Sequence, residues 1–176
     1  GSNCAMALAR TGIGRLIIAD FDIVEEGNLN RQYFFADQVG MKKTAALKDN
    51  IARIDYGTKV VTHDLVLTAD NIAGVFGDCN IIVEAFDRNE MKQLLTETVI
   101  DLWPGRPLIL ASGLAGYGRS NILRQEAAGE NLIVCGDQES EVSEQLPPLA
   151  PRVGIVANMQ ANVVVELLMK MKDHDY

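Results

Sequence analysis

The stretch LIIADFDIVEEGNLNRQ, residues 16–32, decides the fold of this chain. It opens with the apolar run Leu16–Ala19, which predicts a short buried strand that ends at Asp20. In a doubly wound nucleotide-binding fold, an acidic residue at the end of the second strand lies where it can bind a ribose hydroxyl. The alternative is that Asp20 only ends the strand. We expect Asp20 at the carboxyl edge of a parallel sheet.

The polar loop after this strand contains more charged and hydrogen-bonding side chains than a plain dinucleotide site needs. Within a dozen residues it has a carboxylate, two amides and a guanidinium, namely Asp22, Asn28, Gln32 and Arg31. Arginine binds phosphate through forked hydrogen bonds, so the loop points to an anion. Three aromatic residues follow Gln32, and we expect them to hold Arg31 and Gln32 in place. The alternative is an exposed surface pair.

The residues before this strand predict a helix over 1–10, capped by Ser2 or Asn3. In a Rossmann unit a strand and a glycine-rich turn precede the first helix, and neither is seen here. Gly1 fits the last glycine of a G-x-G-x-x-G turn, unless Gly1 and Ser2 are a remnant of cloning. The first strand of such a sheet is central, so its two neighbours would each have an unpaired edge. We expect upstream residues, or another segment, to fill that position.

Helical and strand patterns alternate downstream as far as residue 111. The pattern predicts helices over 41–54, 70–76 and 89–102, and strands over 59–63, 80–85 and 107–111. A helix followed by a strand, repeated four times, implies a parallel sheet with right-handed crossovers.

The pattern changes after Ser112. Glycines punctuate a predicted hairpin or meander, and a further strand is expected over 131–135. Residues 136–151 are acidic and rich in proline, which predicts a solvated, mobile loop. A final helix is expected over 154–172, with apolar residues nearly all round it, so we expect it to be buried in the domain or at a subunit interface. The fold class is therefore α/β: a Rossmann-like, mostly parallel sheet with helices on both faces, an antiparallel C-terminal extension and a buried last helix, in a single domain.

Composition restricts the function. The 176 residues have a net charge of −8, which disfavours nucleic acid as a partner. Cys4, Cys79 and Cys135 lie far apart without a CxxC pair, which argues against a zinc site and suggests a reducing, cytoplasmic setting. A lone cysteine such as Cys135 is usually a small packed residue, and a functional thiol is the alternative. Residues 154–169 are interrupted by polar side chains and do not make a convincing membrane span.

Two further positions are candidates for phosphate chemistry. Asp87 follows the strand expected over 80–85, where a carboxylate can hold Mg²⁺ beside phosphates. The run DRNE at 87–90 also fits a capping box, and the two roles are compatible. Lys42 and Lys43 begin a helix, which is unfavourable for lysine unless an anion lies near, and Lys43 is our choice for phosphate contact. There is no P-loop motif, so scattered cations, a metal and backbone groups must hold any phosphates.

These motifs resemble the ThiF/MoeB/HesA group, bacterial relatives of the ubiquitin-activating enzymes. The resemblance covers nearly the whole chain and rests on ARTGIG at 9–14, DFD at 20–22, NLNRQ at 28–32, GMKK at 40–43, EAFDRN at 84–89 and GIVANMQAN at 154–162. The D-x-D and N-x-x-R-Q combination is its most specific part. The runs VCGD at 134–137 and APRVG at 150–154 look most like a short, zinc-lacking ThiF branch linked to thiamine biosynthesis.

The resemblance implies ATP-dependent adenylylation of the C-terminal glycine of a ThiS-like sulfur carrier, with release of pyrophosphate. It implies that Asp20 binds ribose and that Asp87 coordinates Mg²⁺. Phosphate or nucleotide contacts would come from Gly1, Asp22, Asn28, Arg31, Gln32 and Lys43. Arg31, Lys43 and Asp87 would be catalytic, together with Cys135, which lies roughly where some relatives have a reactive cysteine. The loop over 136–151 would lie near the carrier's tail, and a homodimer without zinc is expected.

Three alternatives remain open. The first is a related adenylylating enzyme with another acceptor, such as a molybdopterin carrier, a peptide or a tRNA base, although the acidic charge weighs against tRNA. The second is a non-catalytic scaffold of the same fold, which the joint presence of Asp20, Arg31, Lys43 and Asp87 disfavours. The third is a nicotinamide dehydrogenase, which has no need of the loop over 28–32.

Overall fold

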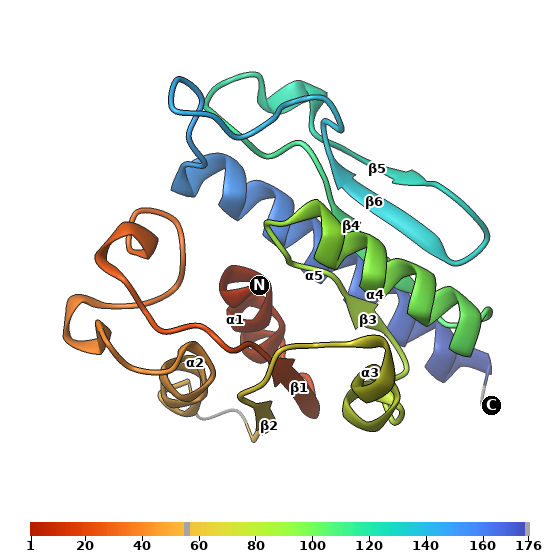
Figure 1. Cartoon of the computed structure of the whole chain (residues 1–176). Coiled ribbons are helices and arrows are strands. Elements are labelled where there is room, and N and C mark those ends of the chain that lie inside the picture. The colour runs from red at the N-terminus through yellow and green to blue at the C-terminus, as the bar shows by residue number, and fades with distance from the viewer. Residues whose placement is uncertain (55–56, 175–176) are drawn as a thin grey trace.

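A computed structural model describes residues 1–54 and 57–174 of the chain (Figure 1). The main elements, in chain order, are α1 (Ser2–Arg10), β1 (Arg15–Ala19), α2 (Lys43–Ala52), β2 (Lys59–His63), α3 (Ala69–Phe76), β3 (Ile82–Val83), α4 (Asn89–Leu102), β4 (Leu108–Ala111), β5 (Arg124–Ala127), β6 (Leu132–Gly136) and α5 (Ala150–His174). Short 3-10 turns cover Glu26–Asn28, Ala36–Gln38 and Ser120–Ile122. The predicted α/β alternation up to residue 111 is confirmed.

The strands form two hydrogen-bonded groups. Strands β1 and β2 pair in parallel, and β3, β4 and β6 form a second parallel group whose edge strand β5 is antiparallel to β6. Within the described residues, no ladder joins β1 to β3. This break lies where the sequence predicted that a central strand is missing; what fills that position stays a prediction.

The C-terminal extension differs from the hairpin or meander that the glycines after Ser112 predict. The hairpin instead joins β5 to β6, and β6 lies parallel beside β4. The strand expected over 131–135 is therefore a central member of its group. The close approach of the ends of β4 and β6 requires glycine at position 136. The φ of Gly136 is +133°, and a Cβ there would lie 1.8 Å from the Ser112 carbonyl oxygen. Glycine is the residue that tolerates both conditions.

Helices cover both faces of the sheet, as predicted. In β4, Leu108 packs into one cluster with Val99 of α4, and the next residue, Ile109, packs into another with Val156 of α5. Alternation along a strand places these side chains on opposite faces. Helices α3 and α4 therefore cover one face, and α1, α2 and α5 lie on the other (Figure 1).

Helix α1 takes part in two hydrophobic clusters. Cys4 and Leu8 pack with residues of α5, β4 and β6, whereas Met6 and Ala9 pack with residues of α2. The small side chains of this helix allow close packing on both sides. Figure 1 shows α1 in the middle of the molecule, with its first residue beside the carboxyl ends of the strands.

Helix α5 begins at Ala150, four residues before the predicted start, because Pro151 is well tolerated in a first helical turn. It is long and apolar enough to cross a membrane by length and composition alone. Its fully buried residues lie in the shared core with α1 and β4, whereas Ile155 and Met169 are exposed. The expected burial in the domain is thus confirmed for one face of α5, and burial of the other face at a subunit interface stays a prediction.

Candidate functional site

The first turn of α1 holds the polar loop that follows β1. The Ser2 hydroxyl accepts a hydrogen bond of 2.9 Å from the Tyr33 N–H, and the Asn3 amide donates one of 2.7 Å to the Arg31 carbonyl. Ser2 and Asn3 were expected to cap the helix, but Gly1 is the N-cap residue and neither side chain caps. These two side chains instead fix the loop against the start of α1, which explains how the chain keeps Arg31 there.

The turn after β3 lies against the same helix end. A Cβ built on Gly1 would lie 3.3 Å from the Ala85 side chain. In Figure 1 the first residue of α1 also lies beside the carboxyl ends of the strands. The start of α1, the end of β1 and the end of β3 therefore meet at one place. Free backbone N–H groups at a helix start favour a negative ligand.

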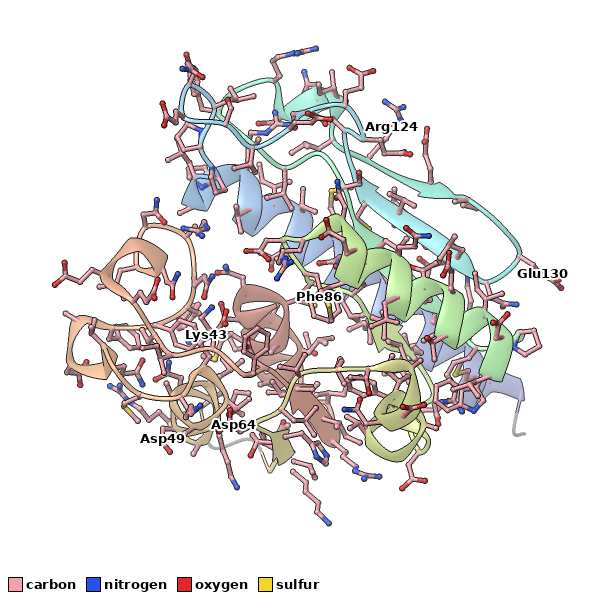
Figure 2. The ribbon with its side chains drawn as sticks, viewed as in Figure 1. Lys43, Asp49, Asp64, Phe86, Arg124 and Glu130 are labelled. Atoms are coloured by element: carbon pink, nitrogen blue, oxygen red, sulfur yellow. The ribbon has the colours of Figure 1, made fainter. Side chains whose placement is uncertain are left out.

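Asp20, Asp22 and Lys43 form a connected group at the end of β1. The Asp20 carboxylate accepts the Asp22 N–H at 2.9 Å, and the Asp22 carboxylate pairs with the Lys43 ammonium at 2.7 Å. The Lys43 N–H also donates to the Asp22 carbonyl at 2.9 Å. Asp22 thus holds Lys43, whose side chain is only 11% exposed. In the view of Figure 2, α1 lies between Lys43 and Phe86, which follows β3.

The other loop residues have mixed roles. Asn28 is buried, and its amide oxygen accepts the Glu25 N–H at 3.0 Å, so part of this side chain has a local structural function. The Arg31 guanidinium donates to the Gly27 carbonyl at 2.7 Å through one nitrogen. Gln32 is half-buried, and the adjacent aromatic segment is anchored by Phe34, which is buried. These contacts orient Arg31 and Gln32 in the loop.

Asp87 lies in the turn between β3 and α4, and it is exposed. The predicted capping role is wrong: the N-cap residue of α4 is Arg88, and no side-chain cap bond is formed there. β3 is also shorter than the predicted strand over 80–85, because the Glu84 carboxylate bonds the Phe86 N–H and starts a turn. Asp87 is therefore available to a ligand at the carboxyl edge of the sheet.

The residues fit Mg²⁺ only as an ion shared with a ligand. Among the described residues, no group of three His, Cys, Asp or Glu side chains is arranged to hold a metal. Mg²⁺ commonly binds one or two carboxylates together with substrate phosphates and water, and Asp87 alone satisfies the protein's share. Lys43, Arg31 and the start of α1 would add positive charge beside such a phosphate-bearing ligand.

Cys135 ends up among apolar side chains. It is fully buried near the end of β6, and burial raises the pKa of its thiol to about 11. A thiol with so high a pKa has little thiolate at neutral pH and is a poor nucleophile. The structure therefore favours a small packed residue at this position over the catalytic role expected by resemblance.

The loop over 136–151 is anchored at both ends. The buried Arg152 guanidinium pairs with the buried Asp137 carboxylate at 2.5 Å and donates to the Gly118 carbonyl at 2.9 Å. Between these ends Glu139, Glu141 and Glu144 are exposed. The sequence predicted the exposed acidic surface but not the buried ion pair, because Arg152 comes after the loop in the predicted pattern.

Sequence reasoning missed three residues at the site: Glu84, Lys92 and Gln160. Lys92, in the first turns of α4, contacts both Glu84 carboxylate oxygens, and Gln160 of α5 donates to the Glu84 carbonyl. A charged residue at the end of an apolar strand was the available signal for Glu84. Lys92, the partner of that charge, lies 8 residues away in the sequence, and Gln160, the partner of the Glu84 carbonyl, lies 76 residues away.

A model of the ThiF family matches residues 1–176. The chain is 32% identical to the "Adenylyltransferase and sulfurtransferase MOCS3" of Aedes aegypti over 69% of this chain and 28% of that protein. It is 28% identical to the UBA4 protein of the same description from Saccharomyces cerevisiae, over 92% of this chain and 38% of that protein. It thus spans less than half the length of these curated relatives.

Among solved structures, the fold is similar to that of an Escherichia coli tRNA N6-threonylcarbamoyladenosine dehydratase, TcdA, in complex with ATP. The TM-score is 0.88 at 20% sequence identity, over 100% of this chain and 84% of that one. At this identity the likeness supports the fold alone. It confirms the predicted Rossmann-like architecture with its C-terminal extension.

Proposed function

This chain belongs to the ThiF family, and from that premise we propose that it is an ATP-dependent adenylyltransferase. Its substrate would be the C-terminal glycine carboxylate of a ubiquitin-fold sulfur carrier of the ThiS kind, serving formation of the thiamine thiazole. The observation that carries the proposal is the meeting of Asp20, Arg31 and Lys43 with the turn of Asp87 at the start of α1. This is an arrangement suited to a nucleotide triphosphate.

The proposed reaction is a displacement at phosphorus. A carboxylate oxygen of the acceptor attacks the α-phosphorus of ATP, the bond to the bridging oxygen breaks, and pyrophosphate leaves with that oxygen. The product is an acyl-adenylate. A carboxylate and a triphosphate repel each other, so charge neutralisation and alignment are the main tasks.

Each group has a defined part in this proposal. Asp20 binds the ribose, Arg31 and Lys43 neutralise phosphate charge, and Asp22 keeps Lys43 in position. Mg²⁺ bound at Asp87 supplies further positive charge at the phosphates. Gly1, Asn28 and Gln32 complete the phosphate-facing loop and helix start.

The charge distribution supports a protein carrier over tRNA as the acceptor. The chain has a net charge of −8, and three exposed glutamates lie on the loop over 136–151. Nucleic-acid binding depends on lysine and arginine at phosphates, so this surface would repel a tRNA backbone. The two curated relatives are described as adenylyltransferases and sulfurtransferases, which agrees with a sulfur carrier.

We also propose that residues 1–176 act as one adenylylating domain in a cytoplasmic homodimer. The exposed apolar residues Ile155 and Met169 on α5 support a subunit contact. Sedimentation at micromolar concentrations tests this part, and a monomer at all concentrations would contradict it.

The activity is tested by ATP–pyrophosphate exchange with Mg²⁺ and purified ThiS-like carriers. The acyl-adenylate is sought by mass spectrometry of the carrier. We expect exchange that requires both the carrier's terminal glycine and Mg²⁺. Asp87→Asn should abolish it, whereas Asp101→Asn, an equally exposed aspartate on α4, should leave it unchanged. Adenylylation of a peptide or of tRNA in place of the carrier would assign another acceptor to the same site.

A further inference from the structure

A buried carboxylate lies beside the proposed nucleotide site and is not used by the reaction. The Glu84 side chain is completely buried at the end of β3. A carboxylate removed from water costs several kcal/mol unless its partners are well placed. A fully buried carboxylate kept at such a cost near a ligand site calls for a specific role.

Lys92 provides the main partner. Its ammonium lies 3.0 and 2.8 Å from the two Glu84 carboxylate oxygens and 2.9 Å from the Ala111 carbonyl at the end of β4. All three ammonium protons therefore have acceptors. Lys92 joins the start of α4 to the ends of two neighbouring strands and has no donor left for a ligand.

Glu84 itself shapes the turn that follows. One carboxylate oxygen accepts the N–H of Phe86, the residue directly before Asp87. The Glu84 backbone is fixed as well: its N–H donates to the Ile109 carbonyl at 2.9 Å, and its carbonyl accepts the buried Gln160 amide at 2.9 Å. Contacts from α4, α5 and β4 thus hold the start of the turn.

Asp87, by contrast, is exposed. Its place relative to the start of α1 depends on the turn that precedes it. A side chain that must hold Mg²⁺ against phosphates gains from a backbone fixed in advance, because the ordering cost is already met before the ligand arrives.

We propose that Lys92 is a positioning residue: through Glu84 it fixes the turn that carries Asp87 and thereby sets the Mg²⁺ dependence of nucleotide binding. The inference rests on the proposed function, since it takes ATP and Mg²⁺ as the ligands. An apolar pair would fill the same space, but it has no acceptor for the Phe86 N–H. Replacement of a buried ion pair by apolar residues is often neutral or stabilising, so stability alone does not account for this pair.

The test measures the affinity of the full chain for ATP, without any carrier, in Mg²⁺ and in EDTA. In the wild type, Mg²⁺ should tighten ATP binding. In Lys92→Met that tightening should shrink by about tenfold or more, the usual loss when a group supporting a metal ligand is removed. Affinity in EDTA should stay close to that of the wild type.

Three control variants separate the positioning role of Lys92 from a loss of charge and from a loss of folding. Lys170→Met makes the same substitution in an exposed pair with Glu166 and should keep the wild-type Mg²⁺ effect. Lys92→Arg retains a cation that can bond both carboxylate oxygens and should restore most of the effect. The double variant Glu84→Gln with Lys92→Met has no buried charge and keeps an acceptor for Phe86, so it should fold and show a Mg²⁺ effect nearer to that of the wild type.

Several outcomes would overturn the proposal. One is an unchanged Mg²⁺ effect in folded Lys92→Met, and another is an equal loss of ATP affinity with and without Mg²⁺, since a purely structural role predicts that. A third needs no variant: the Phe86 amide of the wild type should exchange slowly with solvent before any nucleotide is added, and rapid exchange contradicts a fixed turn. A wild type that binds MgATP but activates no carrier would refute the proposed function and leave this inference standing.

Discussion

At the scale of single residues, the structure separates side chains that face a ligand from those that hold them. Lys43 is a cation held in place by Asp22, through both the side chain and the backbone. A lysine that is mostly buried and fixed by one carboxylate loses little further freedom when a phosphate binds. Its contribution to nucleotide affinity should therefore be large.

Lys43→Met should weaken ATP binding by about 10- to 100-fold, because a hydrogen bond to a charged group contributes about 1.5–3 kcal/mol. Calorimetric titration with MgATP measures the change. Lys48→Met, at an exposed position on the same helix, removes the same charge and should have little effect. Equal losses of ATP affinity in the two variants would show that the overall positive charge of α2 matters and that Lys43 makes no specific contact with phosphate.

Asp137 offers a test by pH. Burial alone would raise the pKa of its carboxyl, but the N–H groups of Ser140 and Glu139 and the Arg152 guanidinium outweigh burial and hold the pKa below its ordinary value. A lowered pKa in the folded state means that this carboxylate stabilises the fold above about pH 4. The contribution is lost as the pH falls through the lower, folded-state value.

Asp137→Asn should therefore reduce the free energy of unfolding at pH 7 by about 3 kcal/mol, since it leaves Arg152 buried without its partner charge. The difference from the wild type should shrink below about pH 4. Urea unfolding at several pH values measures it. Glu166→Gln, in the exposed pair with Lys170, should change stability by less than about 0.5 kcal/mol. A difference that does not vary with pH would show that the Asp137 charge is not responsible.

The cysteines should differ in reactivity according to burial. Cys79 is half-buried, whereas Cys4 and Cys135 are buried and have thiol pKa values raised to about 11. An aromatic disulfide reagent should modify Cys79 first and the other two only when the chain unfolds. Cys135→Ala should leave adenylylation unchanged. Rapid modification of Cys135 in the folded protein would restore it as a candidate nucleophile.

At the scale of elements, the helices and parallel strands up to residue 111 follow from local sequence patterns. The predicted helix over 89–102 and strand over 59–63 match α4 and β2, because apolar spacing and flanking turn residues are local signals. The β5–β6 hairpin was misplaced, and β6 pairs in parallel with β4, a strand more than 20 residues away in the sequence. Gly136 meets Ser112 and Gly113 where these two parallel strands end, and nothing in the neighbouring residues reveals that meeting.

Two glycines should respond in opposite ways to alanine. At Gly136 a Cβ would lie 1.8 Å from the Ser112 carbonyl oxygen and φ is +133°, so Gly136→Ala should destabilise the fold by about 3 kcal/mol or more. Gly154 lies within α5 with open space around its Cβ position, so Gly154→Ala should stabilise the fold by about 0.5–1 kcal/mol. Thermal unfolding of both variants provides the comparison. A destabilised Gly154→Ala would point to a neighbour that packs on this helix.

At the scale of the whole molecule, the site could be predicted in part. The positions of Asp20, Lys43 and Asp87 could be predicted because strand ends and helix starts collect at one edge of a parallel sheet, while their roles in ligand binding stay predictions. Lys92 and Gln160 were not found because their value depends on which distant backbone groups they reach. A lysine in a helix and a glutamine in an apolar helix have many possible partners until the chain is folded.

The net charge of the chain predicts weak binding to polyanions such as tRNA. With a net charge of −8, it should show no retardation of tRNA in a gel shift at micromolar protein and about 0.1 M salt. Binding of a ThiS-like carrier under the same conditions should remain measurable. Retardation of tRNA that falls steeply with salt would favour a tRNA base as the acceptor.

The double packing of α1 has a consequence for how this family can diversify. Neighbouring residues of α1 belong to different hydrophobic clusters, and its first turn also anchors the polar loop. A substitution in α1 therefore disturbs several sets of contacts at once. The exposed acidic residues between Asp137 and Arg152 make few such contacts. During descent from a common ancestor, the sequence of α1 should change little, whereas the segment between Asp137 and Arg152 can change and so alter which acceptor is recognised.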